Sequence, residues 1–557
     1  MWLFNYSPSL FYLEIPLYMK ILKLTLILSL TALHGHAQYS HEDSLKGSIT
    51  PERAWWDLKY YDLSVEVDIE NRFFKGKNTI LYQAVDKGQT LQIDLQAPMK
   101  ITSVMQSDLA TTITKDGPNT YLVTLMEPQV KGQLSAITVF FEGKPKEAPN
   151  APWDGGVSWS KDLEGRPFIA TSNQGIGSSV WWPCKDHMAD EVDSLQISVT
   201  VPDGLWDISN GRLRNMELAE DGKRTTTWFV NNPINNYGVN INIGNYVSWK
   251  DVYKGEKGPL DVSFYVLPEN LDKAKVQFKD AYRTLEALEY WFGPYPFYED
   301  GYKLVEVPYL GMEHQSSVTY GNGFKNGYKG RDLSNTGWGL KWDFIIVHES
   351  GHEWFANNIT DKDKADMWIH ESFTNYSESL FTEYFYGKDA GAEYVIGTRA
   401  NIENISPIIA DYNVNRSGSS DMYYKGGNML HTLRQWVGDD NLWREILRGL
   451  NKTFYHQTVT TAQIENYIAQ EANLDLNGFF TQYLRTTQVP VLEWENRSEK
   501  IRYRYSNTVK GFNLPLEVTI DNNPTTISPN KKWRRIRGLS LEVDEDYYVL
   551  TKKLSDK

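Results

Sequence analysis

Two histidines and a glutamate in one short segment have the residue types and the spacing of a metal site. His348 and His352 are four residues apart in the segment VHESGHEWF, which begins at Val347. On a helix, residues four apart lie on one face, so both imidazoles can bind the same ion. Glu349 lies at the edge of that face, where its carboxylate can hold a water molecule without binding the metal. This H-E-x-x-H pattern predicts a zinc site with an adjacent base.

A third ligand is expected from the segment that follows. Glu371 comes nineteen residues after His352, and residues 372–385 carry apolar side chains at helical spacing. Two histidines and one carboxylate leave the fourth position of tetrahedral zinc open, as in catalytic sites. The competing interpretation, surface histidines on an amphipathic helix, is disfavoured because four of the ten histidines lie between residues 314 and 370.

The composition limits which other functions are possible. The chain has 557 residues, 41% of them hydrophobic and 23% charged, which is typical of a globular protein with three or four domains. Its net charge of −14 lacks the basic signature of a nucleic-acid binder. The single cysteine, Cys184, excludes a disulfide framework or a cysteine-based metal site within the chain. A metal must therefore be held by His, Asp and Glu.

The N-terminus has the pattern of a secretory signal peptide. Lys20 and Lys23 precede an apolar run over residues 24–33, and small residues precede a cut after Ala37. We expect residues 1–37 to be the signal peptide, with Met19 as the true start and residues 1–18 as an upstream mis-start. The run is too short to span a bilayer, so no stable membrane insertion is expected. The mature protein is expected in the periplasm or outside the cell.

Periodicity predicts a multidomain α+β protein that could position this site. Apolar and polar residues alternate with period two in much of residues 46–258, which predicts a large antiparallel β domain. Helical spacing begins near residue 268, and Gly293-Pro294 ends the first long run. We assign residues 259–486 to a mainly α domain that carries the zinc site. Alternation returns in residues 487–557, which we expect to form a short β domain, with no C-terminal helical domain.

Several further motifs resemble one family, the aminopeptidase N family of zinc metallopeptidases. These gluzincins, with leukotriene hydrolase as a relative, share the H-E-x-x-H-x18-E signature. Residues 310–314, LGMEH, resemble the family's G-A-M-E-N motif but differ from it at Leu310, Gly311 and His314. The segments that resemble the family's Y-x-K-G, P-C-x-D and G-P-Y-P-F elements are residues 423–426, 183–186 and 293–297.

The resemblance implies a thermolysin-like catalytic domain and a role for each matching residue. It implies a zinc-dependent aminopeptidase that hydrolyses the N-terminal bond of peptides, with Glu349 as general base on zinc-bound water. Tyr423 would donate a hydrogen bond to the oxyanion. Glu313, assisted by Gln174, would bind the free α-amine of the substrate. The other expected roles are substrate binding on an edge strand for Gly311, Met312 and His314, and support of the ligands for His370.

Two other functions stay open at this stage. One is a zinc endopeptidase of thermolysin type, against which Glu313 argues because an amine anchor blocks extension beyond the first residue. The other is a catalytically inactive scaffold on the same fold, which the complete set of ligands and Glu349 disfavours. The motifs do not decide whether the protein has epoxide hydrolase activity.

Overall fold

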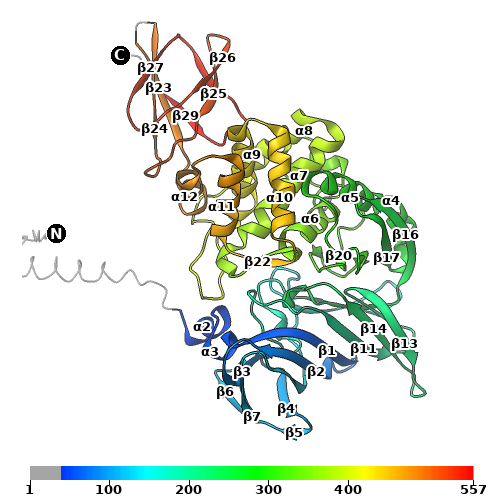
Figure 1. The fold of residues 1–557 in the computed structure, drawn as a ribbon. Helices are drawn as coiled ribbons and strands as arrows, with labels where there is room; N and C mark the ends of the chain where they lie inside the picture. The colour runs from blue at the N-terminus through cyan, green and yellow to red at the C-terminus, as the bar shows by residue number, and fades with distance from the viewer. Residues whose placement is uncertain (1–38, 498, 556–557) are drawn as a thin grey trace, which may run out of the picture.

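The computed structural model describes residues 39–497 and 499–555. The predicted signal peptide lies outside these residues. Within the described part, no helix is long and apolar enough to cross a membrane. The chain forms a large β region, a mainly helical region and a small β region, which lie in this order from bottom to top in Figure 1. The predicted fold class is confirmed.

The N-terminal β region is built around one long sheet. Its strands, in spatial order, are β13 (Arg212–Leu218), β14 (Lys223–Val230), β11 (Leu195–Pro202), β1 (Trp56–Asp68), β2 (Phe73–Ala84), β8 (Leu134–Gly143), β4 (Lys100–Gln106) and β5 (Leu109–Ala110). Burial alternates along β1, as its period-two sequence predicts. The predicted antiparallel β domain contains one parallel pairing in this sheet, between β1 and β11. The region also contains two smaller sheets. The first has the order β12 (Trp206–Ser209), β15 (Ile241–Gly244), β10 (Pro167–Ser172) and β9 (Gly156–Lys161). The second has the order β3 (Gly88–Asp94), β7 (Thr120–Gln129) and β6 (Thr112–Asp116).

The helical region begins with a mixed sheet and continues as packed helices. The sheet order is β16 (Val247–Gly255), β17 (Gly258–Val266), β18 (Tyr302–Glu306), β20 (Val318–Tyr320) and β19 (Gly311–Met312). The main helices are α4 (Leu271–Gln277), α5 (Lys279–Phe292), α6 (Phe344–Gly351), α7 (Trp368–Tyr386), α8 (Lys388–Gly397), α9 (Tyr424–Val437), α10 (Asp440–Thr453), α11 (Thr461–Ala472) and α12 (Asn477–Leu484). The first helical run is broken at Phe278, whose buried ring packs among core aromatics, and α5 ends at Gly293 with φ 95° as expected.

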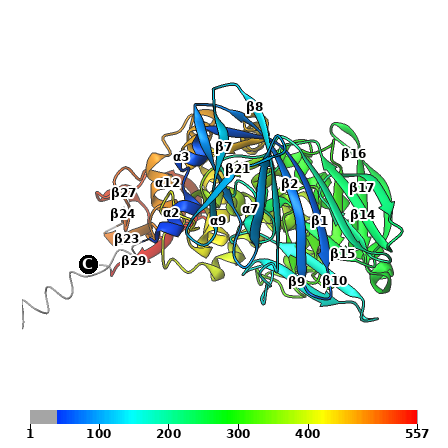
Figure 2. The same ribbon diagram turned by 90° about the horizontal axis from the view of Figure 1, so that it is seen from below.

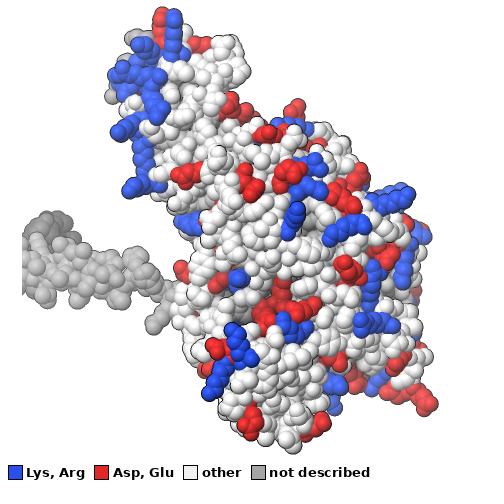
Figure 3. Space-filling model, in the orientation of Figure 1, with Lys and Arg blue, Asp and Glu red and all other residues white. Residues whose placement is uncertain are grey.

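The C-terminal β region consists of two small sheets. One has the order β27 (Arg534–Arg537), β24 (Lys500–Ser506), β23 (Val491–Arg497) and β29 (Leu550–Lys553), and the other β26 (Asn523–Ile527), β25 (Leu516–Ile520) and β28 (Leu541–Val543). Their buried residues continue the apolar core of the helical region, whereas the N-terminal β region has a core of its own. Lys and Arg gather on the C-terminal region, and Asp and Glu gather where the N-terminal β region meets the helices (Figure 3).

The N-terminal β region covers one side of the helices, as the view from below shows (Figure 2). Contacts between the two regions include the Asn210 side chain, whose Nδ2 donates to the Gln315 carbonyl at 2.7 Å, and Thr360, whose hydroxyl donates to Glu191 at 2.5 Å. Both contacts involve segments close in sequence to predicted site residues. Loops of the β region are therefore held against the helices that carry the H-E-x-x-H segment.

Candidate active site

Helix α6 presents the H-E-x-x-H residues inside the core. Its N-cap Asp343 accepts hydrogen bonds from the backbone N–H groups of Ile345 and Ile346, and all eight helical residues are buried. His352 is the C-cap residue but keeps helical dihedrals, φ −63° and ψ −18°, so it stays on the same face as His348. The sequence-based prediction of a shared face is confirmed.

A break in the helix after His352 turns the chain towards its third ligand. Residues Glu353–Asn357 form a kinked turn in which Phe355 and Ala356 have non-helical dihedrals, and the φ of 143° at Ala356 is a strained value for a residue with a Cβ. The chain then passes through β21 (Ile359–Asp361) and enters α7, whose first turn contains Glu371. This return brings Glu371 opposite the two histidines.

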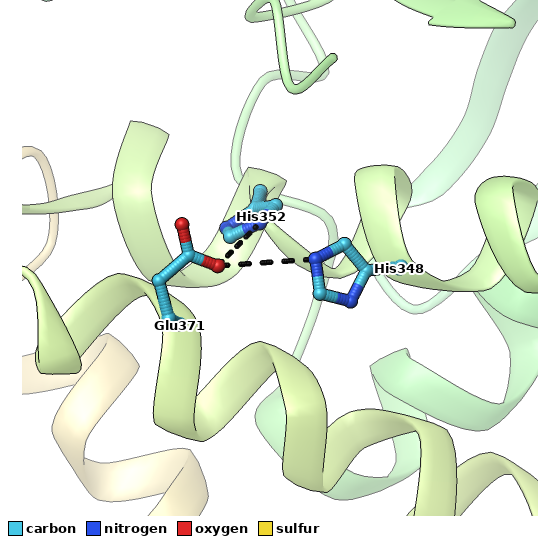
Figure 4. Close-up of side chains that lie close together, drawn as sticks. All are labelled: His348, His352 and Glu371. Carbon is cyan, nitrogen blue, oxygen red and sulfur yellow. Dashed lines mark ion pairs between the residues drawn. The ribbon is translucent and has the colours of Figure 1, made fainter. Parts of the chain in front are cut away.

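The three predicted ligands converge in space (Figure 4). Glu371 Oε2 lies 3.4 Å from Nε2 of His352 and 3.8 Å from Nε2 of His348, and all three side chains are buried. Glu371 Oε2 has no hydrogen-bond donor among the described residues. A buried carboxylate oxygen without a donor is costly unless a cation binds it. Two imidazole nitrogens and one carboxylate oxygen are the donor set of catalytic zinc, so the residues fit that ion.

The second nitrogen of each histidine is already occupied. His348 Nδ1 lies 2.8 Å from Glu378 Oε1, and His352 Nδ1 lies 3.0 Å from the Phe355 carbonyl. With a proton on each Nδ1, the Nε2 atoms keep their lone pairs and would be the atoms that bind a zinc ion. Sequence reasoning missed Glu378. The available signal was its position seven residues after Glu371, two turns along the same face of α7.

Replacing Glu378 with alanine is expected to weaken zinc binding by about 10–100-fold, because His348 would lose the partner that fixes its ring and raises its basicity. Competition with a chromophoric chelator measures this change. Tyr394→Phe is the matched control, because the Tyr394 hydroxyl donates to the other oxygen of Glu378 at 2.8 Å and leaves the His348 contact intact. Equal zinc affinity in Glu378→Ala and the unaltered protein would contradict the assignment.

Two further groups with acid–base character face the same space. Burial raises the pKa of Glu349 to about 7, and the negative charge of Glu313 adds to the effect. Burial also raises the pKa of Tyr423 well above its usual value, as does the adjacent Glu371 carboxylate. Tyr423 therefore keeps its proton at neutral pH and can donate it in a hydrogen bond. Its ring lies 6.1 Å from that of His348.

A glutamine from the N-terminal β region completes the cluster. Gln174 Nε2 donates to Glu313 Oε1 at 2.6 Å and to Glu371 Oε1 at 3.1 Å. Lys364 and Lys46 donate to the carbonyls of the next two residues, Gly175 and Ile176, and so hold the loop. Gln174 thus contacts one member of the metal trio, the set formed by His348, His352 and Glu371, although it is 197 residues from Glu371 in sequence.

The P-C-x-D segment has a structural role in this loop. Its last residue, Asp186, accepts hydrogen bonds from the backbone N–H of Ser179 at 3.2 Å and from the Ser179 hydroxyl at 2.6 Å. Gly177 has φ 88°, and a Cβ there would lie 2.3 Å from Asp186. These contacts shape the turn that follows Gln174.

Strand β19 lies at the edge of its sheet, beside α6. Gly311 and Met312 pair only with β20 and line the cleft. A Cβ on Gly311 would come within 2.5 Å of Ile345 and 3.3 Å of the Glu349 side chain, so the strand can pass this close to α6 only with glycine there. Glu313 follows directly, is 2% exposed, and has its pKa raised by burial.

Two predicted residues lie behind the cleft rather than on its wall. His314 is fully buried, and its Nδ1 lies 3.2 Å from the hydroxyl of Thr319 on β20. His370 Nε2 accepts a 2.8 Å hydrogen bond from the backbone N–H of Asp361, and its ring stacks against Tyr237. Neither is among the residues that line the cleft. Their contacts support the edge strand and the connection from β21 to α7.

The cleft itself has a volume of about 730 Å³, enough for a short peptide. The residues that line it include the metal trio, Glu349, Glu313, Gln174 and Tyr423.

Comparison with known proteins identifies the family to which the chain belongs. The family model of the Peptidase family M1 domain matches residues 277–483, and that of the Peptidase M1 N-terminal domain matches residues 58–237. The chain belongs to peptidase family M1.

Membership of this family confirms the resemblance seen in the motifs. Among relatives, "Probable aminopeptidase 2" of Sulfurisphaera tokodaii is 22% identical over 84% of this chain and 59% of its own length. Mouse "Endoplasmic reticulum aminopeptidase 1" is 22% identical over 76% of this chain and 48% of its own. The chain therefore spans about half the length of the curated relatives it matches.

Solved M1 structures share the fold. A mutant of the M1 zinc metallopeptidase from Deinococcus radiodurans, bound to a Tyr-Ser-Ala substrate, superposes with a TM-score of 0.66 at 20% identity. The match covers 80% of this chain and 98% of that one. A second structure from Deinococcus radiodurans, described simply as an M1 zinc metallopeptidase, gives 0.63 at 21% identity.

Proposed function

We propose that the protein is a zinc-dependent aminopeptidase that hydrolyses the N-terminal bond of peptides. The observation that carries the proposal is the contact of Gln174 with both Glu313 and Glu371. It places a carboxylate and an amide, the partners that an ammonium group needs, directly beside a zinc-type ligand set. A zinc ion bound there supplies Lewis acidity, which polarises a peptide carbonyl and acidifies water.

Glu349 and Tyr423 supply the acid–base chemistry in this proposal. Glu349 takes the proton of the attacking water and passes it to the leaving amine, for which a pKa of about 7 is well suited. Tyr423 keeps its proton and donates a hydrogen bond to the oxygen that gains negative charge in the transition state. Both side chains line the cleft that holds the metal trio.

The amine anchor explains why the first bond would be the one that is cut. Glu313 is buried, so its charge must be balanced by a cation, and the α-ammonium of a peptide is such a cation. If a further residue preceded this one on its N-terminal side, a neutral peptide amide would take the place of the ammonium group beside Glu313. The charge would then stay unpaired and binding would be weakened.

Cleavage of Tyr-Ser-Ala, a substrate bound by one M1 neighbour, tests the proposal. The free-amine peptide is expected to be cleaved at least about 100-fold better than its N-acetyl form, and chelation should stop cleavage until zinc is restored. Glu313→Gln should lower kcat/KM for the free amine by about 10–100-fold, the value of a charged hydrogen bond. Glu403→Gln removes the same charge from another part of the cleft and is the control.

The alternatives predict different outcomes. Equal cleavage of the acetylated and free peptides would favour an endopeptidase of thermolysin type and would remove the amine-anchor role of Glu313. Absence of cleavage in the zinc-loaded protein would favour an inactive scaffold. Hydrolysis of an epoxide fatty acid requires a separate assay, because the zinc ligands and Tyr423 do not distinguish an aminopeptidase from an epoxide hydrolase.

We also propose export to the periplasm or the exterior. The support is the charged, apolar and small-residue pattern over residues 20–37, together with a chain that has only one cysteine. N-terminal sequencing of the natural protein tests this, and a mature start at Gln38 would support cleavage after Ala37.

A further inference from the structure

One cation lines a cleft that is otherwise acidic. The charged residues on its wall include four glutamates, namely Glu313, Glu349, Glu371 and Glu403. Arg331 is the only lysine or arginine among the described residues that line it. Within the described chain, its guanidinium forms no ion pair with a carboxylate, and it lies beside the rings of Tyr328 and Tyr424. An exposed arginine without a carboxylate partner, facing a substrate cleft, is available to an anionic ligand.

A tight hairpin fixes the position of this arginine. The backbone N–H groups of Tyr328 and Arg331 donate to each other's carbonyls at 2.8 and 3.0 Å. The two residues between them, Lys329 and Gly330, have φ values of 53° and 85°, as a type I′ turn requires. The hairpin therefore presents Arg331 from a defined backbone rather than from a long loop.

Aromatic contacts connect the hairpin to the metal trio. The guanidinium carbon of Arg331 lies 5.6 Å from the ring centre of Tyr328, whose ring lies 5.5 Å from that of Phe344. Phe344 in turn stacks on His348 at 5.2 Å. An extended peptide that starts at the metal therefore needs at most about five residues to reach the guanidinium.

The amine-binding pair and the Arg331 hairpin approach the metal trio at different ligands. Gln174 and Glu313 contact Glu371, whereas the hairpin reaches His348 through Phe344. A peptide that runs across the trio from Glu371 to His348 has its ammonium group beside Glu313. Its C-terminus then lies nearest to Arg331. The planar guanidinium matches a carboxylate with two parallel hydrogen bonds.

We propose that Arg331 binds the C-terminal carboxylate of short peptides and so directs the enzyme to oligopeptides of about three to five residues. This inference rests on the proposed aminopeptidase function and adds the substrate class. Longer peptides carry their carboxylate past Arg331 and gain nothing from it. Arg331 is thus a specificity-determining residue on the side of the cleft where the leaving peptide lies.

The test compares Tyr-Ser-Ala with its C-terminal amide. The unaltered enzyme is expected to favour the free acid by about tenfold in kcat/KM, and Arg331→Gln should abolish this preference. Arg331→Lys should restore part of it. Lys329→Gln, which removes a cation from the same turn but not from the cleft wall, is the matched control and should keep the full preference. In peptides of three to eight residues, the acid preference should decline with length.

A binding measurement separates this inference from the proposed function. Calorimetric titration of the zinc-loaded Glu349→Gln variant with the acid and the amide reports the carboxylate contact without turnover. A dissociation constant about tenfold lower for the acid, lost in the double variant with Arg331→Gln, supports the inference. Equal constants overturn it even if the enzyme is an active aminopeptidase. Failure to cleave either peptide, with the binding preference intact, rejects the aminopeptidase function but leaves Arg331 as a carboxylate site.

Discussion

Replacing Glu349 with glutamine is expected to lower kcat by between about 10²- and 10⁴-fold, the usual contribution of a positioned general base. Glutamine keeps the size of the side chain and can still hold water, but it cannot take up a proton. Glu349 is buried at the wall of the cleft, and burial raises its pKa to about 7, so the carboxylate can take up and release a proton near neutral pH at little cost in free energy. Initial rates on Tyr-Ser-Ala measure the effect.

The control for Glu349→Gln is the metal and peptide content of the variant. Zinc measured by mass spectrometry should stay at one ion per chain, and the peptide should bind with little change in affinity, because the histidines and Glu313 are untouched. A loss of activity with zinc and peptide both bound assigns the defect to the chemical step. Activity within tenfold of the unaltered enzyme would contradict the role of Glu349.

Local periodicity was sufficient to predict the metal trio, and the structure shows why. His348 and His352 lie on one helix, so their spacing alone determines that they share a face. Glu371 lies on the next helix in the chain, and α6 and α7 pack together in the core. Short-range sequence information is enough when the elements involved are neighbours in both sequence and space.

Gln174 shows where such reasoning is insufficient. Its side chain reaches Glu313 and Glu371 only because two lysines and Asp186 hold a loop of a separate β region against the helices. No periodicity in residues 172–186 encodes that docking, and family resemblance alone indicated the residue. The hairpin of Arg331 is similar, since its turn residues are visible in the sequence but its contact with the cleft depends on Tyr328 and Phe344.

The parallel pairing of β1 with β11 and the kinked turn after His352 were also not predictable. A period-two pattern determines which face of a strand is buried, but it does not determine the direction of the neighbouring strand. Ala356 has no sequence feature that would indicate φ 143°, because glycine is the residue normally found there. The surrounding packing imposes this dihedral, since Phe355 stacks on Phe373 of α7 at 4.3 Å.

Replacing Glu371 with glutamine is expected to remove both zinc and activity. A neutral amide oxygen is a much weaker zinc ligand than a carboxylate, and two histidines alone do not retain the ion against dialysis. Loss of Lewis acidity is worth several kcal/mol in the transition state, so the rate should fall by about 10³-fold or more. Metal content by mass spectrometry and initial rates on the same peptide give both quantities.

A variant on the same helix separates metal loss from damage to the fold. Glu383 accepts two hydrogen bonds from the guanidinium of Arg434 on α9, at 2.6 and 2.8 Å, and does not line the cleft. Glu383→Gln should lower the free energy of unfolding by about 1–3 kcal/mol while zinc stays bound. When the proteins are compared without zinc, Glu371→Gln should show the reverse, because Glu371 Oε2 has no hydrogen-bond donor among the described residues and an amide oxygen can still accept the hydrogen bond from Gln174. If Glu371→Gln kept its zinc and its rate, the ion would have to lie elsewhere, and the group formed by Glu313, Glu349 and His352 would be the next place to look.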